Sequence, residues 1–451
     1  MTFKIIIFYF LLIFIAGCGG SDSSQTQTET KEDLTAIQTT LPIPTAVTQK
    51  PMLVVRISYN DVSFVNDSFT WSNKLFGNNP SQLNHYYSEV SLGKFGFSPA
   101  AEDQGISNDG VISIALDKEH PDSGYHDTIH PDLQQALEQA NAYIDYSLYD
   151  LDTDGTISSD ELILLFIIAG NEDAYSGDDA TKGVWAHQSC TLSTFTPTLD
   201  GVSLMGCELN GNYALFGERH GDHDATIGII AHELGHSVFS LPDLYDVDNS
   251  SAGIGFFGMM GAGTWGWIDD NDFPGNTPTH FCAWSKISLG WVEPEISTEV
   301  NDIDVVLNES ASVNFNIIKL PININEYFLL ENRNNTGYDR GLSPLTENFQ
   351  GGLAIWHIDE SVISQNLSFN LVNADETHKG VDLEEAAFSV LDSSSSEKGH
   401  EKNLFYSENS DSFDETTAEN SNSYEGLPTG IRVHSISTQG YSMTATLSNP
   451  N

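Results

Sequence analysis

The chain has 451 residues, of which 17 are Lys or Arg and 64 are Asp or Glu, so its formal net charge at pH 7 is -47. It has no basic cluster, and such a chain repels polyanions, which argues against nucleic acid as a partner. The acidic composition suits a salty or calcium-rich medium and offers sites for divalent cations. The length suffices for two folded cores.

The first residues predict export. Lys4 precedes an apolar run over residues 5–16 that is too short to span a membrane comfortably. The run ends in IAGC, which resembles a lipobox, so we expect a lipoprotein signal peptide over residues 1–18 with a lipid on Cys18. An ordinary secretory signal and an uncleaved anchor are the alternatives. Gly19 after the cysteine favours the outer membrane or cell surface, with release into the medium as a further outcome.

Residues 19–50 are rich in Ser, Thr, Gln, Asp and Glu, and this composition predicts a flexible tether. The folded part begins at residues 52–57, MLVVRI, an apolar run that predicts a buried strand. From Pro131 onward, apolar residues recur at helical spacing, which predicts a helix with the proline in its first turn.

Residues 150–161, DLDTDGTISSDE, match the calcium loop of an EF-hand. Gly155 stands where the loop needs a sharp turn, and the β-branched LILLFIIAG that follows predicts a strand instead of a second helix. The alternative is an acidic surface turn. The expected ligands are Asp150, Asp152, Asp154, the carbonyl of Thr156, Ser158 through a water, and a bidentate Glu161.

The sequence contains four cysteines. Cys190 and Cys207 flank a turn-rich insert, and in an exported protein we expect them to form a disulfide that stabilises the fold by about 3 kcal/mol. Cys282 then remains as a lone thiol, which we interpret as a buried packing residue instead of a nucleophile.

The strongest motif is HELGH, residues 232–236, within an apolar segment over residues 224–240 that predicts a helix. Residues four apart lie on one helix face, so His232 and His236 present two imidazoles to one point. Two such nitrogens and a third ligand hold zinc with an open position for water, and Glu233 is placed to take the proton of that water. The implied reaction is metal-assisted hydrolysis, most often of a peptide bond.

Asp243 is the candidate third zinc ligand. Leu241 and Pro242 would end the helix and turn the backbone, which allows Asp243 to return to the metal. A glutamate on a later helix is the other known solution, but the chain has none between Asp243 and Glu293. An ordinary turn aspartate is the alternative.

Three stretches together carry a family resemblance: HELGHSVFSLPDLYD from His232, GIGFFGMMGAGTWG from Gly253, and PTHFCAWSKISLGW from Pro278. They resemble the immune inhibitor A family of secreted bacterial metallopeptidases, peptidase family M6. The resemblance implies an α+β, zincin-like domain, protein substrates, a downstream aspartate ligand, and a turn under the metal that contains Met260. It also implies that residues 85–97 lead from a helix into a strand.

This chain departs from the strict long zinc motif. Phe239 stands where that motif has a glycine, and Pro242 stands where it has the third ligand. Asp243 is therefore one residue late.

Residues 292–294, Val-Glu-Pro, indicate a boundary, so we expect a metallopeptidase domain over 51–295 and a β-rich, sandwich-like C-terminal domain over 296–451. The resemblance continues there, in EYFLLENR, IWHIDE and VNADETHKGVDLEEA. The polar segment over residues 393–423 predicts a long exposed loop. Strands are expected in DIDVVL, SVNFNIIKL, EYFLLENR, GLAIWHID, TGIRVHSI and YSMTATLS.

Several other polar residues are weaker candidates. His187 is as compatible with a structural role as with a place in the cleft, and His357 and His378 favour structural roles. His220 and His223 favour a solvated loop over a metal site, and His280 and Tyr245 are candidates for stabilising an oxyanion.

The sequence therefore predicts a monomeric, surface-tethered zinc endopeptidase with structural calcium, acting on proteins or peptides and held to the membrane through Cys18. Two alternatives remain. One is a calcium-stabilised surface lipoprotein that binds or adheres without catalysis, and the other is a zinc amidase that acts on cell-wall amides.

Overall fold

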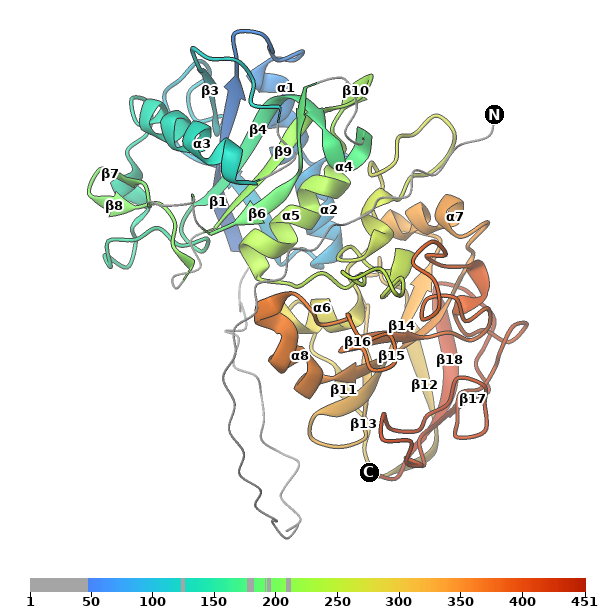
Figure 1. Ribbon diagram of the computed structural model, residues 1–451. Coiled ribbons are helices and arrows are strands. Elements are labelled where there is room, and N and C mark those ends of the chain that lie inside the picture. The colour runs from blue at the N-terminus through green and yellow to red at the C-terminus, as the bar shows by residue number, and fades with distance from the viewer. Residues whose placement is uncertain (1–47, 123–125, 177–181, 191, 193–195, 208–211) are drawn as a thin grey trace.

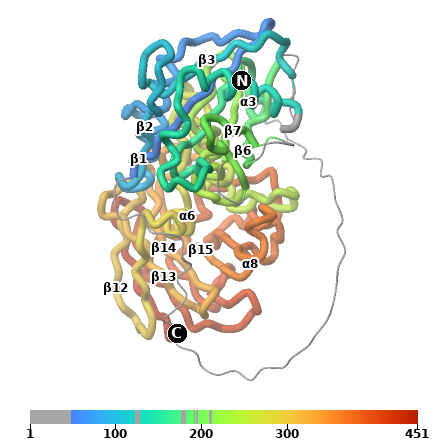
Figure 2. The backbone as a smooth tube through the Cα atoms, turned by 90° about the vertical axis from the view of Figure 1, so that its left-hand side faces the viewer, coloured from blue at the N-terminus to red at the C-terminus, as the bar shows by residue number. Residues whose placement is uncertain are grey.

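The computed structural model describes residues 48–122, 126–176, 182–190, 192, 196–207 and 212–451, and Figure 1 shows their arrangement. Cys18 and nearly all of the predicted tether lie outside the described residues. The fold mixes α-helices with β-sheets. Figure 2 shows the N-terminal half, in blue and green, above the C-terminal half, in yellow to red.

The N-terminal half is built on a sheet in which the strand order is β10-β9-β4-β1-β2, with β3 paired to β1, β5 to β4 and β6 to β9. Strands β2, β3 and β4 are each parallel to β1, and β9 is parallel to β4. The strands are β1 (Thr48–Ser58), β2 (Phe95–Pro99), β3 (Val111–Ala115), β4 (Ile163–Glu172), β5 (Gly183–Val184), β6 (His187–Ser189), β9 (Tyr213–His220) and β10 (His223–Asp224).

Strand β1 is buried on both faces because its side chains alternate between two cores. Met52 and Val54 belong to the core shared with α1 (Ser68–Phe76), α2 (Leu83–Val90) and α5 (Ile227–Phe239). Leu53 and Val55 belong to the core shared with α3 (His126–Ala140). The predicted buried strand is confirmed, and it begins at Thr48, within the segment predicted as a tether.

The predicted passage from a helix to a strand over residues 85–97 is also confirmed, by α2 and β2. Helix α3 differs from the prediction, because Pro131 lies inside the helix and not in its first turn. Its apolar residues Leu133 and Leu137 still face the sheet, as the helical spacing requires.

The segment from residue 146 to the end of β4 positions the predicted calcium loop. A 3-10 turn, Tyr146–Tyr149, precedes the loop, and β4 follows it, so the prediction of a strand in place of a second helix is confirmed. Short elements close this half, namely α4 (Asp173–Ser176), β7 (Thr198–Leu199) and β8 (Val202–Ser203).

The C-terminal half contains two antiparallel-rich sheets, β11-β13-β14-β15-β16 and β12-β18-β17. Apolar side chains from both sheets share one core, which includes Leu307, Phe328, Ile355 and Met443. All six predicted β runs contain a strand. The strands are β11 (Glu295–Ile296), β12 (Val300–Asn308), β13 (Ile318–Pro321), β14 (Glu326–Asn334), β15 (Gly351–Asp359), β16 (Val381–Glu384), β17 (Arg432–His434) and β18 (Ser442–Asn449).

The two halves share a core across the boundary predicted near residue 295. Leu329 of β14 and Trp356 of β15 belong to the same buried cluster as helix α5, together with Trp284 of α6 (Ala283–Ser288). Arg333 links the halves as well, since its Nη1 donates to the carbonyl oxygen of Phe257 at 2.6 Å. Two further helices are α7 (Leu342–Leu345) and α8 (Glu360–Asn366).

The prediction that residues 393–423 form an exposed loop is wrong in part. Leu404, Phe405 and Phe413 are buried, and the last two pack in the core between the C-terminal sheets. The polar composition of the segment hides these few apolar side chains, which is why its pattern predicted exposure.

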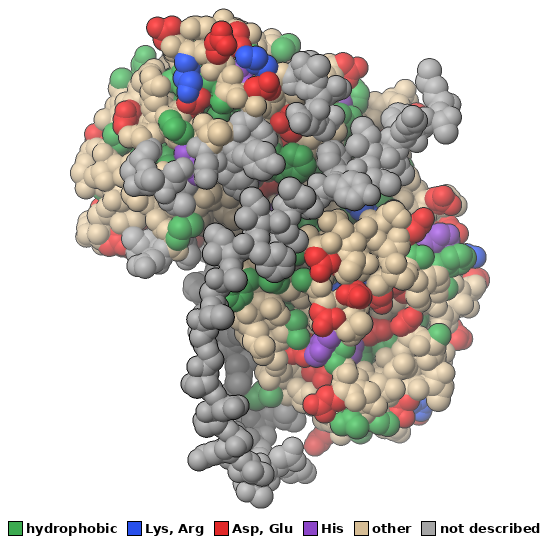
Figure 3. All heavy atoms as spheres, in the orientation of Figure 1, with side chains coloured by type: hydrophobic (Ala, Val, Ile, Leu, Met, Phe, Trp, Pro, Cys, Tyr) green, Lys and Arg blue, Asp and Glu red, His purple; other side chains and the backbone are tan. Residues whose placement is uncertain are grey.

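Within the described residues, no helix has the length and apolar character that crossing a bilayer requires. Figure 3 shows the acidic character of one face, where Asp and Glu side chains outnumber Lys and Arg, as the charge of -47 requires.

Candidate active site

Helix α5 carries HELGH against the sheet. It follows Thr226, and at its end Ser240 adopts the left-handed conformation, with φ 55°. The amide of Ser240 donates to the carbonyl oxygen of His236 at 2.9 Å, and the amide of Leu241 donates to that of Gly235 at 3.1 Å. These bonds end the helix and turn the chain back, as the Leu-Pro pair indicated, so Asp243 returns to the helix face.

The side chains of His232, His236 and Asp243 meet at one point. His232 Nε2 lies 3.0 Å from Asp243 Oδ1, His236 Nε2 lies 3.2 Å from the same oxygen, and the two Nε2 atoms are 3.2 Å apart. Each residue offers one atom to a group in which all ligand atoms lie within 4.8 Å of one another. The arrangement is that of two imidazoles and a carboxylate directed at a common ligand.

Backbone carbonyls fix the orientation of both imidazoles. His232 Nδ1 lies 3.0 Å from the carbonyl oxygen of Met259, and His236 Nδ1 lies 2.6 Å from that of Leu241. A carbonyl oxygen only accepts, so each Nδ1 carries a proton and Nε2 is the ring atom that faces the cluster. Metal-binding histidines have such outer partners in most proteins.

Asn370, from the C-terminal half, holds the aspartate. Its Oδ1 accepts from the amide of Asp243 at 2.7 Å, and its Nδ2 donates to Asp243 Oδ2 at 2.6 Å. Asp243 Oδ2 is therefore occupied, and Oδ1 faces the histidines. Asn370 was not among the residues predicted from the sequence, because no local pattern relates an asparagine to a residue so far away in the chain.

The turn that contains Met260 lies directly against α5. A Cβ on Gly235 would stand 2.5 Å from Met260 Sδ, and a Cβ on Gly228 would stand 1.9 Å from the carbonyl oxygen of Thr264. Glycine at these positions lets the 259–266 segment approach the helix under the histidines. The placement agrees with the turn that the family resemblance implied for Met260.

Burial and the neighbouring charges set the electrostatics of the cluster. Burial opposes the charged form of His236, but Asp243 and Glu233 outweigh it and raise the pKa of His236 to about 9. Burial also opposes ionisation of Asp243, yet both histidines hold its pKa well below the usual range. The carboxylate thus favours positive charge beside it. Burial raises the pKa of Glu233, as suits a group that exchanges protons near neutral pH.

A cavity of about 270 Å³ opens onto this cluster. His232, Glu233 and Tyr245 line it, so the candidate base and a candidate metal ligand face the same space. The lining combines apolar and polar residues, and its further members are Ala174, Trp185, Ile229, Ala262, Trp265, Asp246, Asn249, Ser251, Ser395, Ser396 and Lys398.

The other candidate histidines lie elsewhere. His187 is buried between the carbonyl oxygen of Trp185 and the hydroxyl of Tyr213. His280 is buried, and its Nε2 lies 3.1 Å from Glu89 Oε1. His280 is not one of the residues that line the cavity. His357 and His378 each contact carboxylates in the C-terminal half.

The prediction of a solvated loop is wrong for His220. It is fully buried at the end of β9, and its ring stacks on that of Tyr175 with the ring centroids 4.2 Å apart. His223 pairs with it across the hairpin of β9 and β10 and stacks on Phe273. These residues form a hairpin and not the predicted loop, because β9 and β10 remain paired up to His220 and His223, next to the turn.

The candidate calcium loop brings its acidic residues together. Asp150, Asp152 and Asp154 offer ligand atoms within 4.8 Å of one another. Glu161 folds over the loop, where its carboxylate accepts from the amide of Leu151 at 2.7 Å and from that of Ser158 at 2.9 Å. These bonds hold the Glu161 carboxylate against the loop, next to the place where it would bind calcium.

Cys190 and Cys207 form a disulfide with their Cα atoms 4.8 Å apart. Cys282 is a buried thiol, and its sulfur lies 3.3 Å from the hydroxyl of Ser285. Burial raises the pKa of the Cys282 thiol, which agrees with a packing role.

Comparison with known proteins identifies the class. Residues 49–292 match the model of the immune inhibitor A peptidase M6 catalytic domain. Together with the histidine–carboxylate cluster, this match defines a metallopeptidase domain. The chain belongs to the immune inhibitor A peptidase family, M6.

The pre-pro-metalloprotease PrtV of Vibrio cholerae serotype O1, from strains M66-2 and ATCC 39315, is 24% identical to this chain over 264 residues. The match covers 54% of this chain and 28% of PrtV, so the chain spans under a third of that relative. OgpA from Akkermansia muciniphila superimposes over 72% of this chain and 88% of its own, with 14% identity and a TM-score of 0.30. A TM-score this low does not establish a common fold.

Proposed function

We propose that this protein is a zinc-dependent endopeptidase. The observation that carries the proposal is the convergence of His232 Nε2, His236 Nε2 and Asp243 Oδ1 on one point beside a cavity lined by Glu233. Two imidazoles, of which His236 would release its Nε2 proton when the metal binds, and an ionised carboxylate suit zinc in number and in chemistry. The fixed Nδ1 atoms and the Asn370 contact leave these three atoms free for a metal.

When bound, the zinc ion would supply Lewis acidity and lower the pKa of water. The chain's own residues carry out the rest. Glu233 accepts a proton from the attacking water and then delivers it to the leaving amine nitrogen. The raised pKa of Glu233 favours this return of the proton.

Tyr245 is the candidate for stabilising the oxyanion. It lines the cavity, its ring lies against that of His232, and burial raises the pKa of its phenol, so it remains a donor. The other sequence candidate, His280, has its Nε2 directed at Glu89, which does not support that role.

Removal of the metal tests this function. The purified chain should hydrolyse denatured casein, lose that activity on treatment with a zinc-selective chelator, and recover it when zinc is added back. Activity that survives complete removal of zinc would contradict the proposal.

We further infer that the 150–161 loop binds calcium. Its place immediately before β4, a central strand of the sheet that carries α5, supports a structural role and not contact with substrate. The lipidation of Cys18 and the attachment of the protein to the cell surface remain proposals from the sequence, since that residue lies outside the described part of the chain.

A further inference from the structure

One wall of the active-site cavity comes from the C-terminal half. Ser395, Ser396 and Lys398 line the cavity that also contains Glu233 and His232. The family match ends at residue 292, so this wall lies outside the matched catalytic domain.

Both ends of this wall, the loop 391–398, are fixed to the segment that follows Asp243. The amide of Ala252 donates to the carbonyl oxygen of Leu391 at 2.8 Å, and the amide of Phe256 donates to that of Lys398 at 2.7 Å. Gly255 has φ +53°, and a Cβ there would stand 2.1 Å from the Lys398 oxygen. The close approach requires glycine and holds Lys398 in place.

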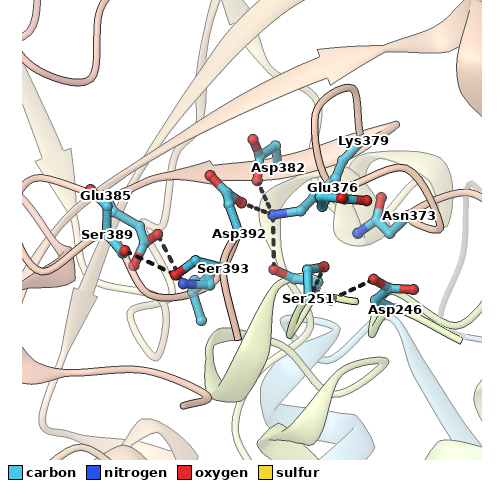
Figure 4. A network of polar contacts seen from close by, with 12 residues as sticks. Asp246, Ser251, Asn373, Glu376, Lys379, Asp382, Glu385, Ser389, Asp392 and Ser393 are labelled. Atoms are coloured by element: carbon cyan, nitrogen blue, oxygen red, sulfur yellow. Dashed lines mark hydrogen bonds and ion pairs between the residues drawn. The ribbon is translucent and has the colours of Figure 1, made fainter. Parts of the chain in front are cut away.

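An ionic network around the buried ammonium of Lys379 supports the same loop, as Figure 4 shows. The ammonium of Lys379 pairs with Asp392 of the loop and lies 2.8 Å from Asp382 Oδ1. It also donates to the carbonyl oxygen of Gly253 at 3.3 Å, next to the cavity. Glu385 accepts from the amide of Leu391 at 3.1 Å. The loop is thus an ordered part of the cavity.

Lys398 differs from the other basic residues. Each other Lys or Arg in the described part of the chain places its charged group in an ion pair, a hydrogen bond or an aromatic contact. Lys398 has no such partner among the residues that the structure describes, although acidic residues dominate the chain. It is exposed, and desolvation by the surrounding protein lowers its pKa. An ammonium in this state gains from any carboxylate that comes within reach.

The acidic residues of the cavity do not supply that carboxylate. Asp246 is buried, and its Oδ2 accepts from the amide of Ser251 at 2.7 Å and from the hydroxyl of Ser250 at 2.8 Å. Glu233 lies on α5, and no contact joins it to Lys398 in the described structure. Among the described residues, no carboxylate that lines the cavity pairs with Lys398, so its ammonium is available to a carboxylate of the substrate.

We propose that Lys398 is a specificity-determining residue that binds a carboxylate of the peptide substrate in the active-site cavity. The inference rests on the proposed peptidase function and names its substrate class, which is acidic peptides. Either an Asp or Glu side chain or the C-terminal carboxylate of a short peptide provides the required group. In a protein with a charge of -47, the overall field repels such substrates, so a single local ammonium has a large effect on selection.

The test uses two series of short peptides. In the first, each position in turn carries either Glu or Gln. In the second, the C-terminus is either a free carboxylate or an amide. Both kcat/KM for cleavage and Kd for binding are measured with the zinc-loaded chain. At one or more positions, or at the C-terminus, the peptide with the carboxylate should have a Kd about tenfold lower and a kcat/KM about tenfold higher than its neutral counterpart. The peptide series that shows the preference tells whether Lys398 binds an acidic side chain or the C-terminal carboxylate.

Variants then assign the preference to Lys398. Lys398→Met should reduce it to within about twofold, and Lys398→Glu should reverse it, while hydrolysis of the neutral peptide persists. Lys402→Met is the matched control, because Lys402 lies outside the cavity against the ring of Phe388 and should keep the wild-type preference. A merely structural lysine would instead lower the values for both peptides equally.

Two results would overturn the inference: equal Kd values for every pair in the wild type, or a preference unchanged in Lys398→Met. The Kd values show whether Lys398 binds a carboxylate even if no peptide is cleaved. A preference in Kd without any cleavage would support the carboxylate site and contradict the peptidase function, so the two proposals fail separately.

Discussion

Asn370 and Asp243 are joined by a pair of hydrogen bonds across 127 residues of sequence. Oδ1 of the asparagine accepts from the aspartate amide at 2.7 Å, and its Nδ2 donates to the aspartate Oδ2 at 2.6 Å. This pair directs Asp243 Oδ1 at His232 and His236. The C-terminal half therefore helps to build the proposed metal site of the catalytic domain.

Asn370→Ala should weaken zinc binding about tenfold to a hundredfold, because Asp243 loses the partner that orients it. The measurement is zinc Kd by competition with a chromophoric chelator. Asn366→Ala is the control, since Asn366 Nδ2 contacts only the helix carbonyl of Val362. An unchanged Kd in Asn370→Ala would show that the contact does not order the ligand.

The HELGH helix and the position of Asp243 were accessible from sequence because both depend on local rules, the spacing of four and the stop at Pro242. The buried strands β1 and β4 were accessible for a similar reason, since both of their faces are apolar. Asn370 and Lys398 were not accessible. They reach the site through the packing of the C-terminal half, and neither lies in a pattern that marks it.

Burial of His220 was missed because a polar stretch, GERHGDHD, suggested a loop, whereas aromatic stacking on Tyr175 compensates for burying the imidazole. The same lesson applies to Leu404 and Phe413, whose apolar side chains are scattered among polar neighbours. Local composition does not reveal which side chain a distant sheet will cover.

Gly228→Ala should destabilise the protein by about 2–4 kcal/mol, because the new Cβ would stand 1.9 Å from the carbonyl oxygen of Thr264. The Met260 turn and helix α5 would have to separate. Urea unfolding measures the change. Gly206→Ala, where a Cβ meets nothing within 4 Å, should be neutral. Equal stability of the two variants would be inconsistent with this packing.

Calcium should raise the melting temperature through the 150–161 loop. Asp152→Ala should lower the melting temperature clearly in calcium and little in chelator, because without the ion its carboxylate accepts only an exposed bond from the amide of Asp154 at 3.1 Å. The control is Asp160→Ala, since Asp160 lies in the loop but pairs with Lys50. If the wild type melts identically in calcium and in chelator, the loop does not bind the ion with useful affinity.

His357 should make stability fall as pH rises above neutral. Burial opposes its charge, but Glu326 at 2.9 Å and Glu384 at 3.0 Å raise the pKa of His357 to about 9. The folded state therefore keeps a proton that the unfolded chain releases near pH 6.5. The stabilisation is complete below that value and is lost as pH rises to about 9, with a slope of at most about 1.4 kcal/mol per pH unit.

Urea unfolding between pH 6 and pH 10 checks this dependence. His357→Gln should flatten the slope, and His434→Gln, a change in a histidine at the protein surface, should leave it as in the wild type. A variant at His357 that keeps the wild-type slope would assign the pH dependence to other groups.

The most direct test of the proposed peptidase function measures zinc content and casein hydrolysis together, in the wild type and in Glu233→Gln. We predict one zinc per chain in both proteins, hydrolysis by the wild type, and a loss of nearly all turnover in the variant, because Glu233 would move the proton while His232, His236 and Asp243 hold the metal. Full activity of Glu233→Gln, or a wild-type chain that binds no zinc, would contradict it.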